Sequence, residues 1–67
     1  MSKGKVKYFN DKKGWGFISG EDMDKEIYVH YTQINMDGYK TLKAGQEVIY
    51  DLTTTDRGYQ AQNVKLE

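Results

Sequence analysis

The residues best suited to chemistry lie in two short runs in which flat rings alternate with slender side chains. The runs are residues 13–18, KGWGFI, and residues 27–31, IYVHY. Because successive side chains of a β-strand point to opposite faces, each run places its rings together on one face. Nucleic acid bases are flat and stack on aromatic rings whatever their identity. Rings bordered by lysines therefore predict a surface for single-stranded nucleic acid.

His30 is the one histidine of the chain, and its surroundings do not suit catalysis or metal binding. The chain has no cysteine, and its carboxylates are not clustered at the spacing of metal ligands. We therefore expect no metal, no cofactor and no enzymatic activity, and we expect His30 to stack with its neighbouring rings.

Length limits the place where a ligand can bind. A chain of 67 residues is one domain, here residues 1–67. A domain of about 60 residues buries only about 60% of its unfolded surface, which leaves no room for an internal ligand cavity. The chain also lacks cysteine, a secretory signal and an apolar run long enough to span a bilayer. We therefore expect a cytoplasmic protein that does not bind membranes and that binds its ligand on its outside.

Charge is balanced in total but uneven along the chain. Ten lysines and arginines offset ten acidic residues. The first thirteen residues carry five lysines against Asp11, whereas acidic residues surround Lys25 in the segment 21–26. This pattern predicts a basic and an acidic part of the surface. It also predicts few phosphate contacts and a shallow salt dependence of binding.

Alternating side chains and turn residues predict an all-β fold. The expected strands cover residues 3–10, 15–19, 26–31, 46–53 and 59–66. The long connection 32–45 includes one expected helical turn at 32–34, and Val48, Tyr50 and Leu52 are expected on one side of the fourth strand. Five short strands without a long helix must cover their edges, so we expect a small five-stranded antiparallel barrel.

The function depends on which face of the second and third strands points into this barrel. Burying the rings would place an indole, a phenol and an imidazole where each unpaired polar atom costs about 1–3 kcal/mol. We therefore expect the slender side chains inside, namely Gly16, Ile18, Ile27 and Val29. The rings expected on the outside are Trp15, Phe17, Tyr28 and His30.

These motifs resemble those of the bacterial cold-shock proteins, which are stand-alone cold-shock domains with an OB-fold barrel. Residues 13–18 resemble the first ribonucleoprotein motif of that family and residues 27–31 the second. Residues 37–40, Leu42 and residues 56–58 are also similar. The resemblance covers essentially the whole chain.

The resemblance implies an RNA chaperone that binds single-stranded RNA and DNA, with a preference for pyrimidine-rich stretches. It implies a monomer, or a dimer in which two copies exchange strands. The positions that match nucleic-acid contacts of the family are Lys7, Tyr8, Lys13, Trp15, Phe17, Tyr28, His30, Tyr31, Tyr39 and Arg57, with Phe9 and Gln60 as weaker candidates.

Several positions depart from the family pattern. The family usually has tryptophan at Tyr8, phenylalanine at Trp15 and proline at Tyr59, so base preference is open. Tyr8 also breaks the alternation that starts at Val6, and a bulge near Lys7 would place it outside. The last strand breaks alternation as well, at Ala61, Val64 and Leu66. A different interpretation of the rings is an SH3-like barrel that binds a proline-rich peptide.

Overall fold

The computed structural model describes residues 2–21, 25–38 and 40–67. The predicted strands are all present, with ends within two residues of the expected ones. Tyr31 is an exception, because it begins a short 3₁₀ helix and does not extend the third strand. The elements are β1 (Ser2–Asn10), β2 (Trp15–Gly20), β3 (Glu26–His30), η1 (Tyr31–Gln33), β4 (Glu47–Thr55) and β5 (Gly58–Leu66).

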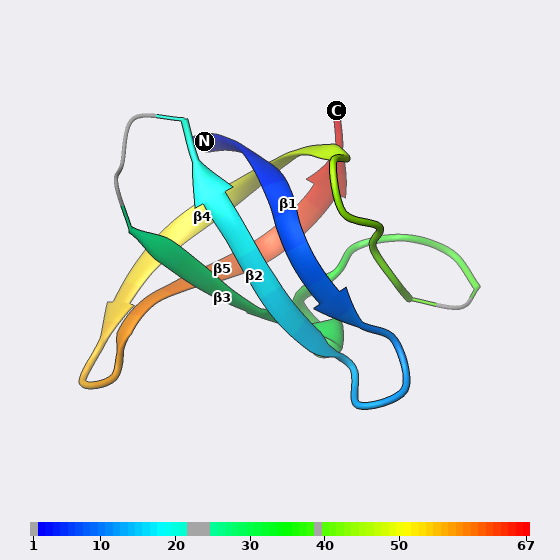
Figure 1. Cartoon of the computed structure of the whole chain (residues 1–67), viewed down its shortest axis with the longest axis horizontal. Coiled ribbons are helices and arrows are strands. Elements are labelled where there is room, and N and C mark those ends of the chain that lie inside the picture. The colour runs from blue at the N-terminus through cyan, green and yellow to red at the C-terminus, as the bar shows by residue number, and fades with distance from the viewer. Residues whose placement is uncertain (1, 22–24, 39) are drawn as a thin grey trace.

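The strands close into a barrel in the order β1-β2-β3-β5-β4 (Figure 1). This confirms the expected all-β, five-stranded architecture. Neighbouring strands are antiparallel except β3 and β5, which run parallel and meet where Tyr28 lies opposite Gln60. In the part of the chain that the structure describes, no helix is long and apolar enough to cross a membrane.

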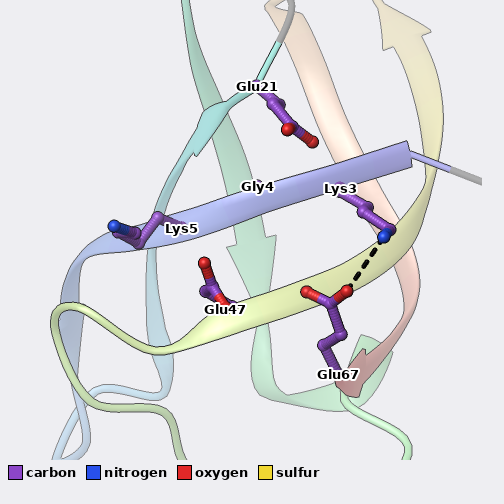
Figure 2. A pocket seen from close by; sticks show the side chains of 6 residues that line it. All are labelled: Lys3, Gly4, Lys5, Glu21, Glu47 and Glu67. Carbon is purple, nitrogen blue, oxygen red and sulfur yellow. Dashed lines mark ion pairs between the residues drawn. The ribbon is translucent and has the colours of Figure 1, made fainter.

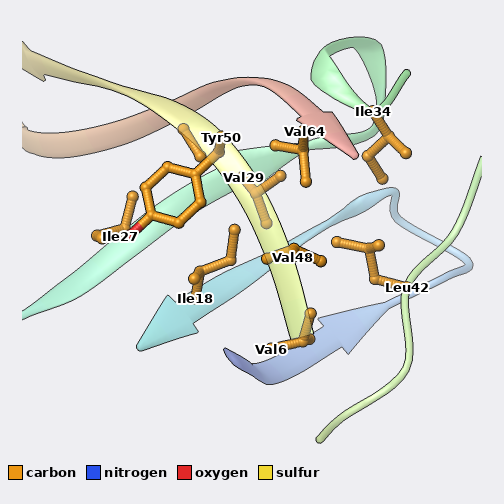
Figure 3. Packing of buried hydrophobic residues seen from close by; sticks show 10 residues of the cluster. Val6, Ile18, Ile27, Val29, Ile34, Leu42, Val48, Tyr50 and Val64 are labelled. Atoms are coloured by element: carbon orange, nitrogen blue, oxygen red, sulfur yellow. The ribbon is translucent and has the colours of Figure 1, made fainter. Parts of the chain in front are cut away.

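The barrel interior is filled by aliphatic side chains and one tyrosine (Figure 3). Ile18, Ile27 and Val29 are fully buried, and Gly16 is buried between them and β1. The expected orientation of β2 and β3 is therefore confirmed. Among the described residues, the buried apolar side chains are those of Val6, Ile18, Ile27, Val29, Ile34, Leu42, Val48, Tyr50, Ala61 and Val64.

A bulge in β1 resolves the position of Tyr8. Val6 pairs with Ile18, but Tyr8 pairs with Phe17, so Lys7 is an extra residue in β1. An extra residue reverses the inward and outward sides of the strand beyond it. Val6 is consequently buried while Tyr8 is 47% exposed.

A second irregularity, in β5, explains why alternation fails there. Ile49 pairs with Lys65 and Asp51 with Gln62, so β5 has one more residue than β4 over this stretch. Asn63 lies in this stretch and has a left-handed backbone, with φ of 51°. The extra residue lets Ala61 and Val64 both face the core.

The inner side of β4 is covered over only part of its length. Val48 and Tyr50 are buried as expected, but Leu52 is 39% exposed although it pairs with the buried Ala61. The core therefore ends before Leu52.

Opposite charges gather where β1 begins (Figure 2). Lys3 Nζ lies 2.9 Å from Glu67 Oε1, and Glu21 and Glu47 lie nearby on neighbouring segments. The hydrogen bond to Glu67, followed by the attraction of its charge, raises the pKa of Lys3 above its ordinary value of 10.5. Lys3 is thus engaged with carboxylates at the end of β1 farthest from Tyr8.

The close approach of β1 and β2 makes Gly16 sensitive to substitution. A Cβ on Gly16 would meet the carbonyl oxygen of Tyr8 and would lie 2.6 Å from Phe9 Cα. We expect Gly16→Ala to destabilise the fold by on the order of 3 kcal/mol, because backbone atoms must move. The measurement is urea unfolding followed by far-UV circular dichroism.

Gly38→Ala is the matched control for this substitution. Gly38 has φ of 77°, and a Cβ there would meet no described atom within 4 Å. Only the left-handed backbone then opposes alanine, at a cost of about 1–2 kcal/mol. Equal losses in the two variants would contradict the steric explanation for Gly16.

The Lys3–Glu67 pair predicts a specific dependence of stability on alkaline pH. The pKa of Lys3 is raised in the folded state. The ion pair therefore contributes fully to stability below a pH of about 10.5, the ordinary lysine pKa, and this contribution is lost as the pH rises through the higher folded pKa. We expect Glu67→Gln to lower the melting temperature at pH 9, and this difference from the unsubstituted protein to shrink by pH 12. Asp56→Asn, in the β4–β5 turn, is the control. A difference that stays constant over this range would exclude the ion pair as its cause.

Candidate nucleic-acid interface

Six rings form one continuous surface over β1, β2, β3 and the start of η1. We call this surface the ring platform. Each ring contacts at least one other, with centroids 4.7–6.5 Å apart. Its members are Tyr8, Trp15, Phe17, Tyr28, His30 and Tyr31.

Trp15 lies among three other rings of the platform. Its centroid is 6.0 Å from that of Tyr8 and 5.8 Å from that of Phe17, and both of these contacts are edge to face. Tyr28 lies nearly parallel to the indole, at 6.4 Å and 29°. Such contacts hold the rings in fixed orientations. The tryptophan therefore lies within the platform, while a tyrosine occupies the position on β1.

The platform continues from β3 into η1. Tyr28 and His30 are nearly parallel at 6.5 Å, and His30 and Tyr31 are 4.7 Å apart with a tilt of 40°. Although Tyr31 belongs to η1, it stays beside the rings of β3. The turn into η1 thus extends the surface.

The platform remains accessible to solvent. Tyr8 is 47% and Tyr31 45% exposed, and the four rings between them are half-buried because they pack against one another. A contiguous exposed aromatic patch is unusual on a small domain and marks a binding site. Flat ligands have access to ring faces here.

Gly14 allows Tyr31 to lie against the turn between β1 and β2. Its φ is 78°, and a Cβ at this position would meet the Tyr31 ring. The Tyr31 N–H donates to the Gly14 carbonyl oxygen at 2.8 Å. The backbone of this turn therefore positions one end of the platform.

The same turn carries the lysines nearest to Tyr31. The Asn10 side-chain oxygen accepts hydrogen bonds from the N–H groups of Lys12 and Lys13, at 3.1 and 3.0 Å. These lysines line a hollow of about 470 Å³ together with Tyr31 and Lys40. Asp11 also lines this hollow. Positive charge consequently borders the Tyr31 end of the platform.

Lys7 is held by an acidic residue in this structure. Its Nζ lies 2.6 Å from Glu26 Oε1, and both side chains are about half exposed. The predicted separation of basic and acidic surfaces is therefore incomplete, because β1 and β3 lie on either side of β2 and a lysine of β1 reaches a carboxylate of β3. Part of the Lys7 charge is already compensated.

A groove of about 590 Å³ lies beside the platform, between β3 with η1 and the turn that joins β4 to β5. Phe17, Tyr28 and His30 form its ring-bearing side, and Arg57 and Gln60 come from the opposite side. The structure thus brings these two polar candidates next to the rings. Lining residues that are not among the predicted contacts are Thr32, Gln33, Thr55 and Tyr59.

The sequence does not predict the polar lining of this groove, because isolated threonines and glutamines are common on protein surfaces. The parallel pairing of Tyr28 with Gln60 brings β5 beside β3, and no local pattern reveals that pairing. Tyr59 gave the one available signal, as an aromatic residue next to a predicted turn. It packs in part against the core.

Two other predicted site residues have different positions. Phe9 is half-buried and packs against the core cluster, so its ring is less accessible than that of Tyr8. Tyr39 lies outside the described residues. Among the residues that the structure describes, no group of three histidine or acidic side chains could hold a metal ion.

Comparison with known proteins agrees with this geometry. The family model described as the 'Cold-shock' DNA-binding domain matches residues 2–67. The "Cold shock protein CspD" of Bacillus subtilis (strain 168) is 52% identical over 64 residues, which cover 96% of each chain. The "Cold shock-like protein CspA" of Stigmatella aurantiaca (strain DW4/3-1) is 46% identical over 65 residues, covering 97% of this chain and 96% of that one.

A solved structure, "drosophila Unr CSD456", has the same fold. It superposes with a TM-score of 0.82 at 17% identity, over 98% of this chain and 26% of that longer one. The family match leaves the SH3-like interpretation without support. The chain belongs to the cold-shock domain family of nucleic-acid-binding OB-fold barrels.

Proposed function

We propose that residues 1–67 act as a single-stranded RNA- and DNA-binding domain that works without chemistry. The observation that carries this proposal is the continuous ring platform, whose rings lie in contact and half exposed across three strands and η1. Unstacked bases can lie on such rings, whereas bases in a duplex are already stacked on one another. Holding unstacked bases opposes hairpins, which is the action of an RNA chaperone. A cytoplasmic location would give access to transcripts.

Stacking supplies most of the affinity in this proposal. Each stacked base contributes about 1–3 kcal/mol, and an OB fold covers about 4–16 nucleotides. A few such contacts give micromolar to nanomolar affinity after the cost of ordering the strand. Pyrimidines are the expected preference, because the family resemblance implies it.

Charge contributes less to the binding affinity than stacking does. The net charge is zero, and Lys7 and Lys3 are paired with Glu26 and Glu67. Lys13 and Arg57, which border the platform and its groove, are the proposed contacts to phosphates or base edges. Gln60 is the polar group beside them.

Fluorescence of Trp15, the single tryptophan, tests the proposal directly. Oligothymidine should quench or shift this fluorescence saturably, because a base would stack beside the indole. A proline-rich PxxP peptide serves as the competing ligand. A response to the peptide alone would reject the nucleic-acid proposal.

Chaperone activity needs its own measurement. A fluorescently labelled RNA hairpin, whose stem has one pyrimidine-rich strand, should open at a lower temperature when the protein is added. An unchanged melting curve at concentrations that saturate oligothymidine would limit the function to binding.

Phe17→Ala should weaken binding of oligothymidine by about 1–3 kcal/mol, the contribution of one stacked base. The fold should persist, because Phe17 lies on the outer face of β2 and outside the buried core. Leu66→Ala, which removes a 48% exposed apolar side chain away from the platform, is the control. Equal affinities of the Phe17 and Leu66 variants would remove Phe17 from the site.

The lysines should differ in their effect on salt dependence. Lys13→Ala should make the negative slope of log K against log salt shallower by about one unit. Glu26→Gln should raise binding at low salt, because it frees Lys7 from its ion pair. Lys3→Ala is the control for loss of a remote lysine. Titrations at several salt concentrations measure the slopes, and an unchanged slope in the Lys13 variant would contradict its phosphate contact.

A further inference from the structure

His30 ends β3 and precedes η1, and its ring is held from several sides. Tyr28 lies at 6.5 Å on one side and Tyr31 at 4.7 Å on another. Its main chain pairs with Trp15 on β2. These contacts fix the plane of the imidazole within the ring platform. Its hydrogen bonds then decide which of the two ring nitrogens carries the proton.

Thr32 makes two contacts with the same nitrogen of this ring. The Thr32 Oγ1 atom lies 2.9 Å from His30 Nδ1, and the Thr32 backbone N lies 3.4 Å from it. A backbone N–H can only donate, so Nδ1 must offer its lone pair. The hydroxyl, which can donate or accept, then donates as well. This arrangement also makes His30 the cap of η1.

If Nδ1 accepts from Thr32, the proton of the neutral ring is on Nε2. The described hydrogen bonds of His30 all run to Thr32 through Nδ1, so Nε2–H is left for a ligand. His30 lines the groove together with Arg57 and Gln60, and no carboxylate is among the described residues that line it. The other charged or titratable groups facing this groove are Tyr28, Arg57 and Tyr59. His30 thus presents a donor and no acceptor to the groove.

We propose that Thr32 is a positioning residue that holds His30 in the Nε2–H tautomer, so that the ring donates a hydrogen bond to an acceptor of a bound base. The carbonyl oxygens of thymine and uracil are such acceptors. In the opposite tautomer the same Nε2 atom would be an acceptor, and a carbonyl would meet a lone pair. This inference rests on the proposed function, but the tautomer itself can be measured on the free protein.

The first experiment measures the tautomer by ¹⁵N NMR of the His30 ring at pH 8.5. We expect the pattern of an Nε2-protonated ring in the unsubstituted protein and in Thr32→Ser, which keeps the hydroxyl. Thr32→Val removes the nearer donor, the hydroxyl at 2.9 Å, and leaves only the backbone N–H at 3.4 Å, so both nitrogen shifts should move toward a mixture of tautomers. An Nδ1-protonated ring, or a spectrum unaffected by Thr32→Val, would overturn the proposal.

The second experiment measures selectivity. It compares oligothymidine with an oligomer whose bases are 2,4-difluorotoluene, which has the shape of thymine and stacks but lacks its carbonyl acceptors. Loss of the carbonyls should weaken binding to the unsubstituted protein and to Thr32→Ser. We call the fold-loss of affinity caused by removing the carbonyls the penalty. In Thr32→Val the penalty should be about three- to tenfold smaller, which corresponds to one neutral hydrogen bond. The same penalty in all three proteins would overturn the assigned role.

A matched substitution elsewhere separates this effect from general loss of a threonine. Thr54→Val lies on β4, outside the groove lining, and should keep both the ring spectrum and the penalty of the unsubstituted protein. A change in this variant equal to that of Thr32→Val would also overturn the proposal. Failure of oligothymidine to bind at all would reject the proposed function and the selectivity, while the nitrogen spectrum would still decide whether Thr32 sets the tautomer.

Discussion

The narrow interior of the barrel is the constraint on which the rest of this structure depends. It is filled by slender side chains such as Ile18, Ile27 and Val29, which leave almost no accessible surface. Strand alternation then requires their ring-bearing neighbours to point outward. The core and the ring platform are thus two sides of the same strands. The platform arises because slender side chains take the inward positions of β2 and β3, so the rings of these two strands take the outward ones.

Two strand irregularities interrupt the alternation of inward and outward side chains. Each lies where strict alternation would place a side chain on the wrong face. The extra residue at Lys7 turns Tyr8 onto the platform, and the extra residue near Asn63 lets Ala61 and Val64 both reach the core. Gly16 permits β1 to pass close enough for the first bulge to pair with β2. Each irregularity is therefore tied to a particular packing requirement.

The surface differs from a purely electrostatic nucleic-acid site. Its rings touch one another over β1, β2, β3 and η1, whereas Lys3 and Lys7 are held by carboxylates. Because exposed ion pairs are weak, Lys7 can still contact a phosphate, but only by giving up its contact with Glu26. The arrangement favours stacking as the main source of affinity. Polar groups in the adjoining groove then become the natural source of base preference.

The sequence alone determined the strands, the orientation of β2 and β3 and the family, because alternation and motif spacing are local properties. It also pointed to a bulge near Lys7, since Tyr8 violated the alternation. Only the tertiary structure decided that Lys7 meets Glu26, that Gln60 lies opposite Tyr28 and that Thr32 holds one nitrogen of His30. The first two contacts join residues far apart in the chain. The third, although local, depends on the backbone turn into η1 and on rings contributed by neighbouring strands, and no residue pattern specifies that geometry.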